Sequence, residues 1–328
     1  MSKSDADKEK EKSLVNKAVD AIIRPPRRHY DVSKLPLYLN CGDKQNYVRH
    51  PLNFSNARDQ KIVGSIYLTE GQDIMNGGPC IIYMHGNASS QIEGQFLIPN
   101  FCPRNIAVYC FDFAGCGESD GDYISLGYFE TLDINYLMDF LHSTFNLGPF
   151  ALWGRSMGAA TAVLARSPYL KCIVVDSTFT SVPDVVSAIA KKQKLPSFLV
   201  PAVLWFLKNT VKGRAGFDMK DVSPLEAGSQ PDSVPMIQGH ATDDEFIPID
   251  QGRQLFSAYS NPDKVFHHLH GGHNGRRNAN WLTEAIKFVL SHFGANVGDV
   301  KYVSYTGMQS QDDEHFKDFD AMMEGKRN

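Results

Sequence analysis

The segment Gly154-Arg155-Ser156-Met157-Gly158 constrains the fold more than any other part of this sequence, because of what flanks it. The apolar run 150–153 before it predicts a short buried strand, and the run 159–165 after it predicts a helix. Two glycines allow the backbone to turn sharply between the strand and the helix. Such a turn lifts the serine hydroxyl above a sheet and points it toward the helix N-terminus, which is the geometry of a nucleophile elbow.

A second Gly-x-Ser-x-Gly match, residues 117–121, lacks this context. Its serine, Ser119, lies beyond the predicted strand 106–113 in a turn rich in acidic residues, and no helix pattern follows. Neighbouring carboxylates would oppose a negative charge developing at that serine. We therefore expect Ser156, and not Ser119, to be the nucleophile.

Apolar runs alternate with helical patterns from residue 80 onward, as in a doubly wound α/β fold. Continuous apolar runs suit strands that are buried on both faces of a parallel sheet. The predicted strands are residues 80–84, 106–113, 150–153, 172–175, 235–238 and 265–269. Upstream, runs 47–54 and 62–68 flank a turn-rich segment, which predicts an antiparallel hairpin at the edge of the sheet.

Residues 180–233 interrupt this alternation, because they are far more than one crossover helix needs. We predict a small helical cap over the carboxyl edge of the sheet and refer to these residues as the cap segment. Its apolar side chains favour a lipophilic acyl substrate and raise the hypothesis of peripheral membrane contact; ordinary packing on the sheet is the alternative. They are Phe198, Leu199, Leu204, Trp205 and Phe206.

Composition excludes several other classes of function. Of the 328 residues 42% are apolar, enough for a sizeable core, and a net charge of −4 gives no basic surface for nucleic acid. Six cysteines lie scattered without the spacing of a metal site, so we expect neither a metal nor a cofactor. Three of them, Cys80, Cys110 and Cys172, lie in predicted buried strands, which favours a reducing compartment, and we expect a cytoplasmic protein.

The ends of the chain predict where the folded domain begins and stops. Residues 1–12 alternate lysine with acidic side chains, which predicts disorder and does not match a secretory signal. The acidic end, 296–328, is expected to be flexible, which leaves 13–295 as the folded domain. The longest apolar run, 198–207, is about half of the roughly 20 residues that span a bilayer.

A nucleophilic serine needs a histidine as base and an acid that orients the histidine, both downstream of Ser156 in a fold of this kind. The loop after strand 235–238 offers two candidate acids, Asp243 and Asp244, and Asp176 at the end of strand 172–175 is a further alternative. If Asp243 is not the acid, we expect it near a helix N-terminus.

The candidate base is His273, which follows the strand 265–269 in the run Gly271-Gly272-His273. Two glycines permit a tight loop that brings the imidazole back over the sheet. His270 is the alternative. The sequence thus predicts a histidine at the same edge of the sheet as the elbow.

An oxyanion hole needs two backbone N–H groups that point at the developing charge. One is expected from Met157, directly after the nucleophile. The other is expected from the loop after strand 80–84, where Asn87 is the first candidate and Ala88 the alternative. We expect His85, in the same loop, to brace the backbone and not to act in catalysis.

Four separated blocks, at residues 85–87, 112–121, 154–158, and Asp244 with His273, together resemble the α/β-hydrolase superfamily. The resemblance covers residues 20–293 and is strongest to the branch with α/β-hydrolase-domain depalmitoylases, Bem46-like proteins and prolyl-aminopeptidase-like enzymes. Residues 23–27 also resemble an uncharacterised plant and protist subgroup. The depalmitoylases carry an N-terminal cysteine cluster for a lipid anchor, whereas the first cysteine here is Cys41, which argues against an anchored depalmitoylase.

The resemblance implies Ser156 as nucleophile, Asp244 as acid and His273 as base, with backbone donors at Asn87 and Met157. The expected activity is cleavage of a small carboxylic ester or thioester through an acyl-enzyme, without metal or cofactor. Amide or peptide hydrolysis is one alternative, and a non-catalytic binding module of the same fold is another. The sequence does not determine the oligomeric state.

Overall fold

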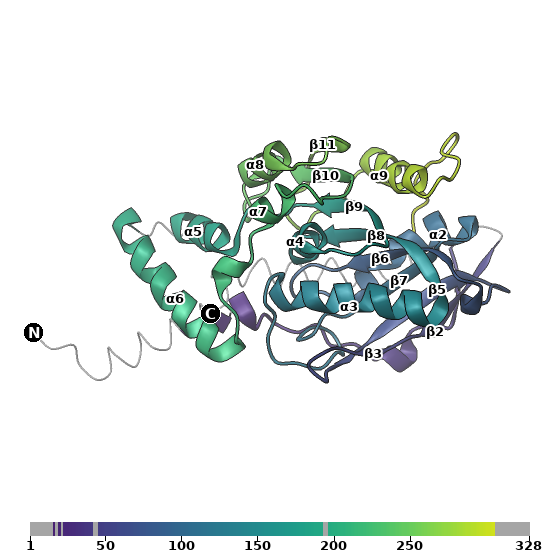
Figure 1. Ribbon diagram of the computed structural model, residues 1–328, viewed down its shortest axis with the longest axis horizontal. Helices are drawn as coiled ribbons and strands as arrows, with labels where there is room; N and C mark the ends of the chain where they lie inside the picture. The colour runs from purple at the N-terminus through teal and green to yellow at the C-terminus, as the bar shows by residue number, and fades with distance from the viewer. Residues whose placement is uncertain (1–15, 17–18, 21, 42–44, 193–195, 306–328) are drawn as a thin grey trace, which may run out of the picture.

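One mixed β-sheet forms the centre of the molecule (Figure 1). The computed structural model describes residues 16, 19–20, 22–41, 45–192 and 196–305. Within this part of the chain the sheet has nine strands, in the order β1-β2-β5-β7-β6-β8-β9-β10-β11. Their bounds in chain order are β1 Tyr38–Asn40, β2 Asn46–Pro51, β5 Gly64–Thr69, β6 Gly78–Met84, β7 Ala107–Phe111, β8 Leu147–Arg155, β9 Leu170–Asp176, β10 Met236–Ala241 and β11 Lys264–Leu269. A separate ladder pairs β3 (Phe54–Ser55) with β4 (Lys61–Ile62).

The prediction of a mostly parallel sheet with antiparallel N-terminal strands is confirmed. Neighbouring strands from β7 across to β11 pair in parallel, whereas β1, β2, β5 and β7 pair antiparallel. The two edges of the sheet differ from prediction. The hairpin of β2 and β5 lies inside the edge, because the short strand β1 pairs outside it. Strand β11 was expected to be buried on both faces, but it forms the opposite edge and leaves Val265 41% exposed.

Helices cover both faces of the sheet. The α-helices are α2 (Ile98–Phe101), α3 (Tyr128–Phe145), α4 (Met157–Leu164), α5 (Val182–Lys192), α6 (Val200–Ala215), α7 (Pro224–Gly228), α8 (Ile249–Ala258) and α9 (Ala279–His292). Short 3₁₀ helices are η1 (Val32–Lys34), η2 (Ile74–Asn76), η3 (Gln91–Leu97), η4 (Cys102–Arg104), η5 (Ser197–Leu199) and η6 (Met219–Asp221). No helix among the described residues has the length and apolar character needed to cross a bilayer.

Two hydrophobic cores lie on opposite faces of the sheet, since side chains alternate along each strand. In β6, Cys80, Ile82 and Met84 belong to the core shared with α3, α4 and α8. Ile81 and Tyr83, between them in sequence, belong to the core shared with α2 and α9. Burial on both faces explains why continuous apolar runs predicted these central strands.

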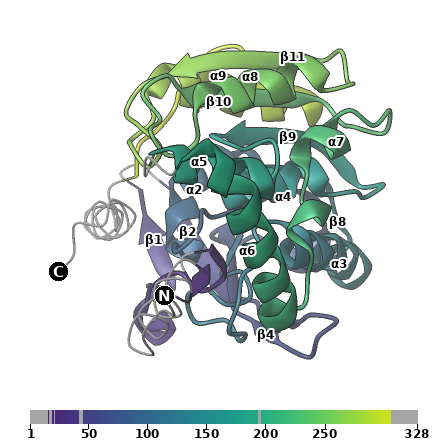
Figure 2. The same ribbon diagram turned by 90° about the vertical axis from the view of Figure 1, so that its left-hand side faces the viewer.

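The cap segment contains α5, α6 and α7 with η5 and η6 between them. Helix α5 begins at Val182, soon after β9 ends at Asp176, and α6 packs against α5 and η6. Seen from the left of Figure 1, both helices lie in front of the strands (Figure 2). Helix α7 instead contacts α4 and α8 beside the sheet.

The folded part of the chain extends beyond its predicted end at residue 295. Val300 and Tyr305 are buried in the core beneath α9, and the backbone N–H and C=O of Val303 bond to the side chain of Asn100. Residues 296–305 are therefore packed, which corrects the expectation of a flexible tail over this stretch. The remainder of that tail, 306–328, and the predicted disordered segment 1–12 lie outside the described residues.

Candidate active site

The turn between β8 and α4 places Ser156 at the N-terminus of α4 in a strained conformation. Its φ is +52° and its ψ is −112°, a region that residues other than glycine rarely adopt. The positive φ lies at the serine itself and not at the flanking glycines, which differs from the expected role of those glycines. A Cβ at Gly154 would overlap the carbonyl group of Gly158, and a Cβ at Gly158 would overlap that of Met84. Both glycines are thus required for close backbone packing.

The side chains of Ser156, His273 and Asp244 meet at the carboxyl edge of the parallel strands. His273 Nε2 lies 2.9 Å from Ser156 Oγ, and His273 Nδ1 lies 2.7 Å from Asp244 Oδ2. All three residues are buried. A carboxylate only accepts, so Nδ1 carries the hydrogen and Nε2 is left to accept the serine proton. The three residues come from loops far apart in sequence, as the motif argument predicted.

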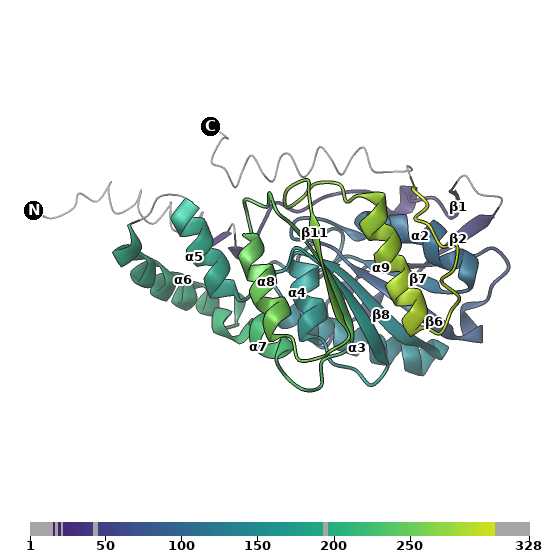
Figure 3. The same ribbon diagram turned by 90° about the horizontal axis from the view of Figure 1, so that it is seen from above.

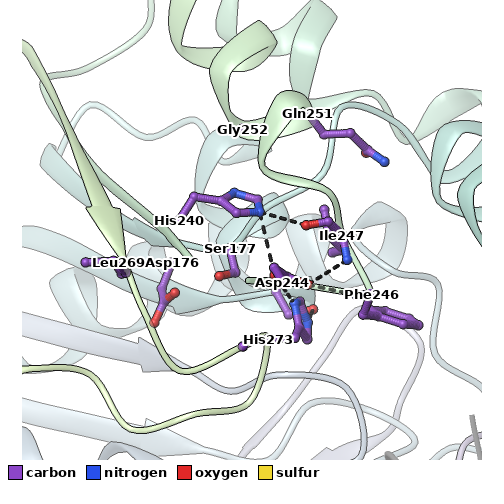
Figure 4. Close-up of polar contacts among 12 residues, drawn as sticks. Asp176, Ser177, His240, Asp244, Phe246, Ile247, Gln251, Gly252, Leu269 and His273 are labelled. Carbon is purple, nitrogen blue, oxygen red and sulfur yellow. Dashed lines mark hydrogen bonds and ion pairs between the residues drawn. The ribbon is translucent and has the colours of Figure 1, made fainter. Parts of the chain in front are cut away.

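Backbone hydrogen bonds fix the carboxylate of Asp244 (Figure 4). Its Oδ1 accepts from the N–H groups of Phe246 and Ile247 at 2.9 and 2.7 Å, which leaves Oδ2 for His273. Burial alone would raise the pKa of Asp244, but the charge and hydrogen bond of His273 and the Ile247 N–H lower it below its usual value. Asp244 is therefore ionised beside the imidazole, and its Oδ2 accepts the Nδ1–H of His273.

The side chains of the alternative acids and of the alternative base have other partners. Asp243 is exposed and accepts from Gly271 N–H at 3.1 Å, so it supports the turn before His273 and does not lie at a helix N-terminus. His270 contacts Thr242 Oγ1 on the exposed side. Asp176 is paired with Arg277, whose Nε lies 2.8 Å from Oδ2. None of these three side chains is hydrogen-bonded to the Ser156 hydroxyl; Asp176 contacts Ser156 only through its backbone carbonyl, which accepts from Ser156 N–H at 2.9 Å.

Ser119, in the second Gly-x-Ser-x-Gly match, is a structural residue. Its Oγ donates to the carbonyl oxygen of Asp112 at 2.6 Å and accepts from Val63 N–H at 2.8 Å. The side chain is 1% exposed, so its hydroxyl does not reach a substrate. The expectation that the acidic turn 117–121 is not an elbow agrees with this geometry.

A second buried histidine, His240, was not predicted. Its Nε2 donates to the carbonyl oxygen of Ile247 at 2.9 Å and lies 3.6 Å from Asp244 Oδ2 (Figure 4). Burial lowers the pKa of His240, against the opposing effects of the Ile247 carbonyl and Asp244. The neutral imidazole of His240 therefore holds the Asp244 loop through its N–H, which donates to the Ile247 carbonyl oxygen. No sequence pattern marks this role, since the histidine simply ends a strand.

Two arginines that the sequence analysis did not single out hold the His273 loop. Arg155 Nη2 donates to the carbonyl oxygens of His273 and Gly275 at 3.0 and 3.3 Å. Arg277 Nη2 donates to the same His273 oxygen at 2.9 Å, and its Nη1 donates to Gly272 at 2.9 Å. The two guanidinium groups pair with buried carboxylates, Arg155 with Glu93 and Arg277 with Asp176. Each arginine thus ties the base to the sheet through a charged hydrogen bond.

Of the predicted backbone donors, Met157 directly follows the nucleophile, and Asn87 follows Gly86, where an added Cβ would lie 3.8 Å from Ser156 Cβ. Met157 is the first residue of α4, so its N–H has no acceptor within the helix. In the loop after β6, the Ala88 N–H bonds to the Cys116 thiol, and Gly86 N–H donates to Glu93 Oε2 at 3.2 Å. Because the N–H groups of Gly86 and Ala88 have these acceptors, the Asn87 N–H is a better candidate for the second oxyanion donor than the Ala88 N–H.

Hydrogen bonds of His85 and of the N-terminal segment hold the region of this loop in place. His85 Nε2 accepts from Phe113 N–H at 3.0 Å, in keeping with a bracing role. Tyr30 donates to Asp112 Oδ2 at 2.7 Å and accepts from Gln91 Nε2 at 2.6 Å. Tyr30, before the sheet, therefore holds together the segments that follow β6 and β7. Among the described residues, no group of three or more acidic, histidine or cysteine side chains is arranged to hold a metal.

The chain is similar to several known hydrolases and uncharacterised proteins. The family model Hydrolase_4, described as serine aminopeptidase S33, matches residues 79–221. The uncharacterised protein YqkD of Bacillus subtilis strain 168 is 26% identical over 200 residues, which cover 59% of this chain and 64% of YqkD. The lysophosphatidylserine lipase ABHD12 of Danio rerio is 24% identical over 187 residues, covering 54% of this chain and 46% of that protein. The matched part of this chain spans less than two thirds of each of these relatives.

A solved structure with the same arrangement of strands and helices is the esterase Pf2001 of Pyrococcus furiosus. It aligns with a TM-score of 0.59 at 18% identity, over 83% of this chain and 97% of the esterase chain. At this identity the likeness concerns the fold.

Proposed function

We propose that this chain, a member of the α/β-hydrolase superfamily, is a serine hydrolase that cleaves carboxylic esters or thioesters of lipophilic acyl groups. The observation that carries the proposal is the pair of contacts at His273, 2.9 Å to Ser156 Oγ and 2.7 Å to Asp244 Oδ2. A serine hydroxyl becomes a useful nucleophile only when such a base accepts its proton.

In the first half of the reaction, Ser156 Oγ forms a bond to the substrate carbonyl carbon while its proton moves to His273 Nε2. The ionised Asp244 stabilises the imidazolium, and the N–H groups of Met157 and Asn87 donate to the oxyanion. Collapse of this tetrahedral intermediate breaks the bond to the leaving alcohol or thiol, which takes the proton from Nε2. The acyl group then remains on Ser156.

In the second half, water replaces the leaving group. His273 Nε2 takes one proton from the water as its oxygen bonds to the acyl carbon, and returns it to Ser156 Oγ when the carboxylic acid departs. Arg155 and Arg277 touch no reacting atom; they hold the backbone of the base through both halves. We class them as positioning residues.

Esters and thioesters are preferred as substrates for two reasons. The relatives include a lipase and an esterase by name. The cap segment exposes large apolar side chains at one end of the molecule, which suits an acyl chain. The family name serine aminopeptidase favours amide hydrolysis as a second candidate. Parallel assays with a p-nitrophenyl acyl ester and an aminoacyl p-nitroanilide distinguish the two.

A fluorophosphonate probe tests the nucleophile directly. Wild-type protein should be labelled and should lose esterase activity in proportion, whereas Ser156→Ala should be neither labelled nor active. Ser119→Ala is the matched control and should keep both properties. Labelling that survives Ser156→Ala would refute the assignment, and a wild-type protein inert to the probe and to a broad ester panel would favour a binding module.

We also propose a cytoplasmic location. All six cysteines are free thiols, and five of them are buried. Such usage suits a reducing compartment. Fractionation of cells that express the tagged chain tests this, and recovery only from a secreted fraction would contradict it.

A further inference from the structure

The cap segment carries an apolar protrusion, residues 196–206, which we name the apolar tip. It comprises η5 and the first half of α6, contains no charged side chain, and has Ser197 as its one hydroxyl-bearing residue. Its largest side chains are exposed instead of packed: Phe198 is 78% exposed, Trp205 69%, Phe206 43% and Leu199 39%. Packing on the sheet, the alternative raised by the sequence, therefore does not account for these four residues.

The apolar tip lies at the end of the molecule farthest from strands β2 and β5. Figures 1 and 3 both place the start of α6 there, beyond α5. Val203 and Leu204 are partly buried against the core, and full burial is reached at Leu207 and Val211, which are 5% and 0% exposed. The helix is thus anchored at its base while its apolar start extends into solvent. Contiguous exposed apolar surface of this kind marks a docking site.

Cationic side chains lie directly behind the apolar tip. Lys191, Lys212 and Lys220 are exposed on α5, α6 and η6, and Lys208 pairs with Asp218 at 2.9 Å. The acidic groups nearby are partly engaged, since Asp184 accepts from the hydroxyls of Thr180 and Ser181. An apolar wedge with lysines one or two turns behind it matches the two layers of a membrane interface, acyl chains below and phosphates above.

A groove of about 340 Å³ beside Trp205 has the same two-part chemistry. Its walls are mostly apolar, and lysines stand at its rim. The lining residues are Pro183, Pro201, Leu204, Trp205, Lys208, Met219 and Lys220. This lining offers an apolar wall for part of an acyl chain and lysine ammonium groups for a phosphate.

We propose that the apolar tip docks this protein on the surface of an anionic phospholipid bilayer. The wedge of Phe198 and Trp205 enters the interface, and the lysines contact the headgroups. Because α5 starts just after β9, docking would turn the carboxyl edge of the sheet, with Ser156, toward the bilayer. The docking itself stands on the exposed surface; only this consequence, delivery of a lipid ester from the membrane, rests on the proposed function.

Vesicle co-sedimentation of the full chain tests the proposal. Wild type should pellet with phosphatidylcholine–phosphatidylglycerol vesicles and remain in solution with pure phosphatidylcholine. The double variant Phe198→Ser/Trp205→Ser should bind the vesicles at least about tenfold more weakly than wild type, because the inserted apolar area is lost. Lys212→Glu/Lys220→Glu should bind weakly too. The matched control is Leu132→Ser/Tyr136→Ser, which removes two exposed apolar side chains from α3 and should bind like wild type.

Two further measurements separate this proposal from its rivals. The circular dichroism spectrum and the urea unfolding midpoint should be equal in wild type and the tip variant, which shows that the variant is folded. Ser156→Ala should bind vesicles like wild type, so loss of the proposed catalysis does not affect the result. Equal binding by the tip variant, or equal binding to neutral vesicles, would overturn the proposal. So would a dimer in light scattering that the tip substitutions dissociate, because a second copy would then occupy the tip.

Discussion

The carbonyl oxygen of His273 accepts hydrogen bonds from two guanidinium groups, those of Arg155 and Arg277. Arg277 donates as well to Gly272 and to Ser177 Oγ, and it pairs with the buried Asp176. Five donors in a planar fork allow these contacts at once, which a lysine ammonium does not reproduce. The position of the base therefore depends on an arginine that contacts no reacting atom.

Arg277→Lys should lower kcat about tenfold, because small displacements of a catalytic group are costly, and should change KM little. The lysine keeps a charge for Asp176 but loses the fork. Steady-state kinetics on a p-nitrophenyl ester and the rate of fluorophosphonate labelling should fall together. Arg276→Lys, at the exposed neighbouring position, is the control. A rise in KM with unchanged kcat would show that Arg277 acts on substrate binding instead.

Some of the site could be predicted from single residues and some could not. Ser156 follows the buried strand β8, and His273 follows the apolar run that forms β11. Glycines that the backbone requires lie beside both; Gly271 and Gly272 have φ of +101° and +64°. The two arginines and His240 have no such signature, because their partners are backbone carbonyls that only the fold brings near. The sequence analysis expected Gly154 and Gly158 to let the backbone turn. In the structure glycine is needed at both positions because a Cβ atom would overlap a backbone carbonyl group.

At the level of elements, the backbones of β6, β8 and α4 pack closely against one another where they meet. Gly158 lies against the carbonyl of Met84 at the end of β6, so α4 approaches the sheet closely and Ser156 is pressed into its positive φ. The central strands were predictable because they are buried on both faces. Strand β1 was not predicted, because it is short. Strand β11 was predicted as residues 265–269, but its position at the edge was not, because an apolar run suggests burial on both faces.

Gly158→Ala should destabilise the protein by roughly 1–3 kcal/mol, the usual cost of overpacking, and should abolish labelling of Ser156. Gly213→Ala in α6 is the matched control. No atom lies within 4 Å of the added methyl group there, so the free energy of unfolding should rise by about 0.5 kcal/mol. Urea denaturation measures both variants. A Gly158→Ala protein as stable and active as wild type would contradict the packing of α4 described here.

For the whole molecule, buried carboxylates make stability depend on pH. Asp176 is buried, which opposes ionisation, but Arg277 and further hydrogen bonds lower its pKa below the usual value; the pKa of Asp244 is lowered in the same way. The folded state then binds fewer protons than the unfolded chain around pH 4. This stabilisation is present above the unfolded-state pKa and is lost as pH falls through the lower folded-state pKa.

The free energy of unfolding should therefore decrease between about pH 5 and pH 3, and Asp176→Asn should show a shallower decrease. Comparison of wild type with the variant cancels other groups, such as Asp133, whose pKa burial raises to about 6. Urea titrations at several pH values measure the two slopes. Identical slopes would mean that Asp176 has the same pKa in both states.

The central claim is that Ser156, with His273 as its base, forms the acyl-enzyme. The most direct measurement is to mix the protein with a p-nitrophenyl acyl ester, quench in acid during turnover, and map the adduct by peptide mass spectrometry. We expect the acyl group on Ser156 in wild type and no adduct in His273→Ala. Turnover without an adduct at Ser156, or an adduct on any other side chain, would contradict the account.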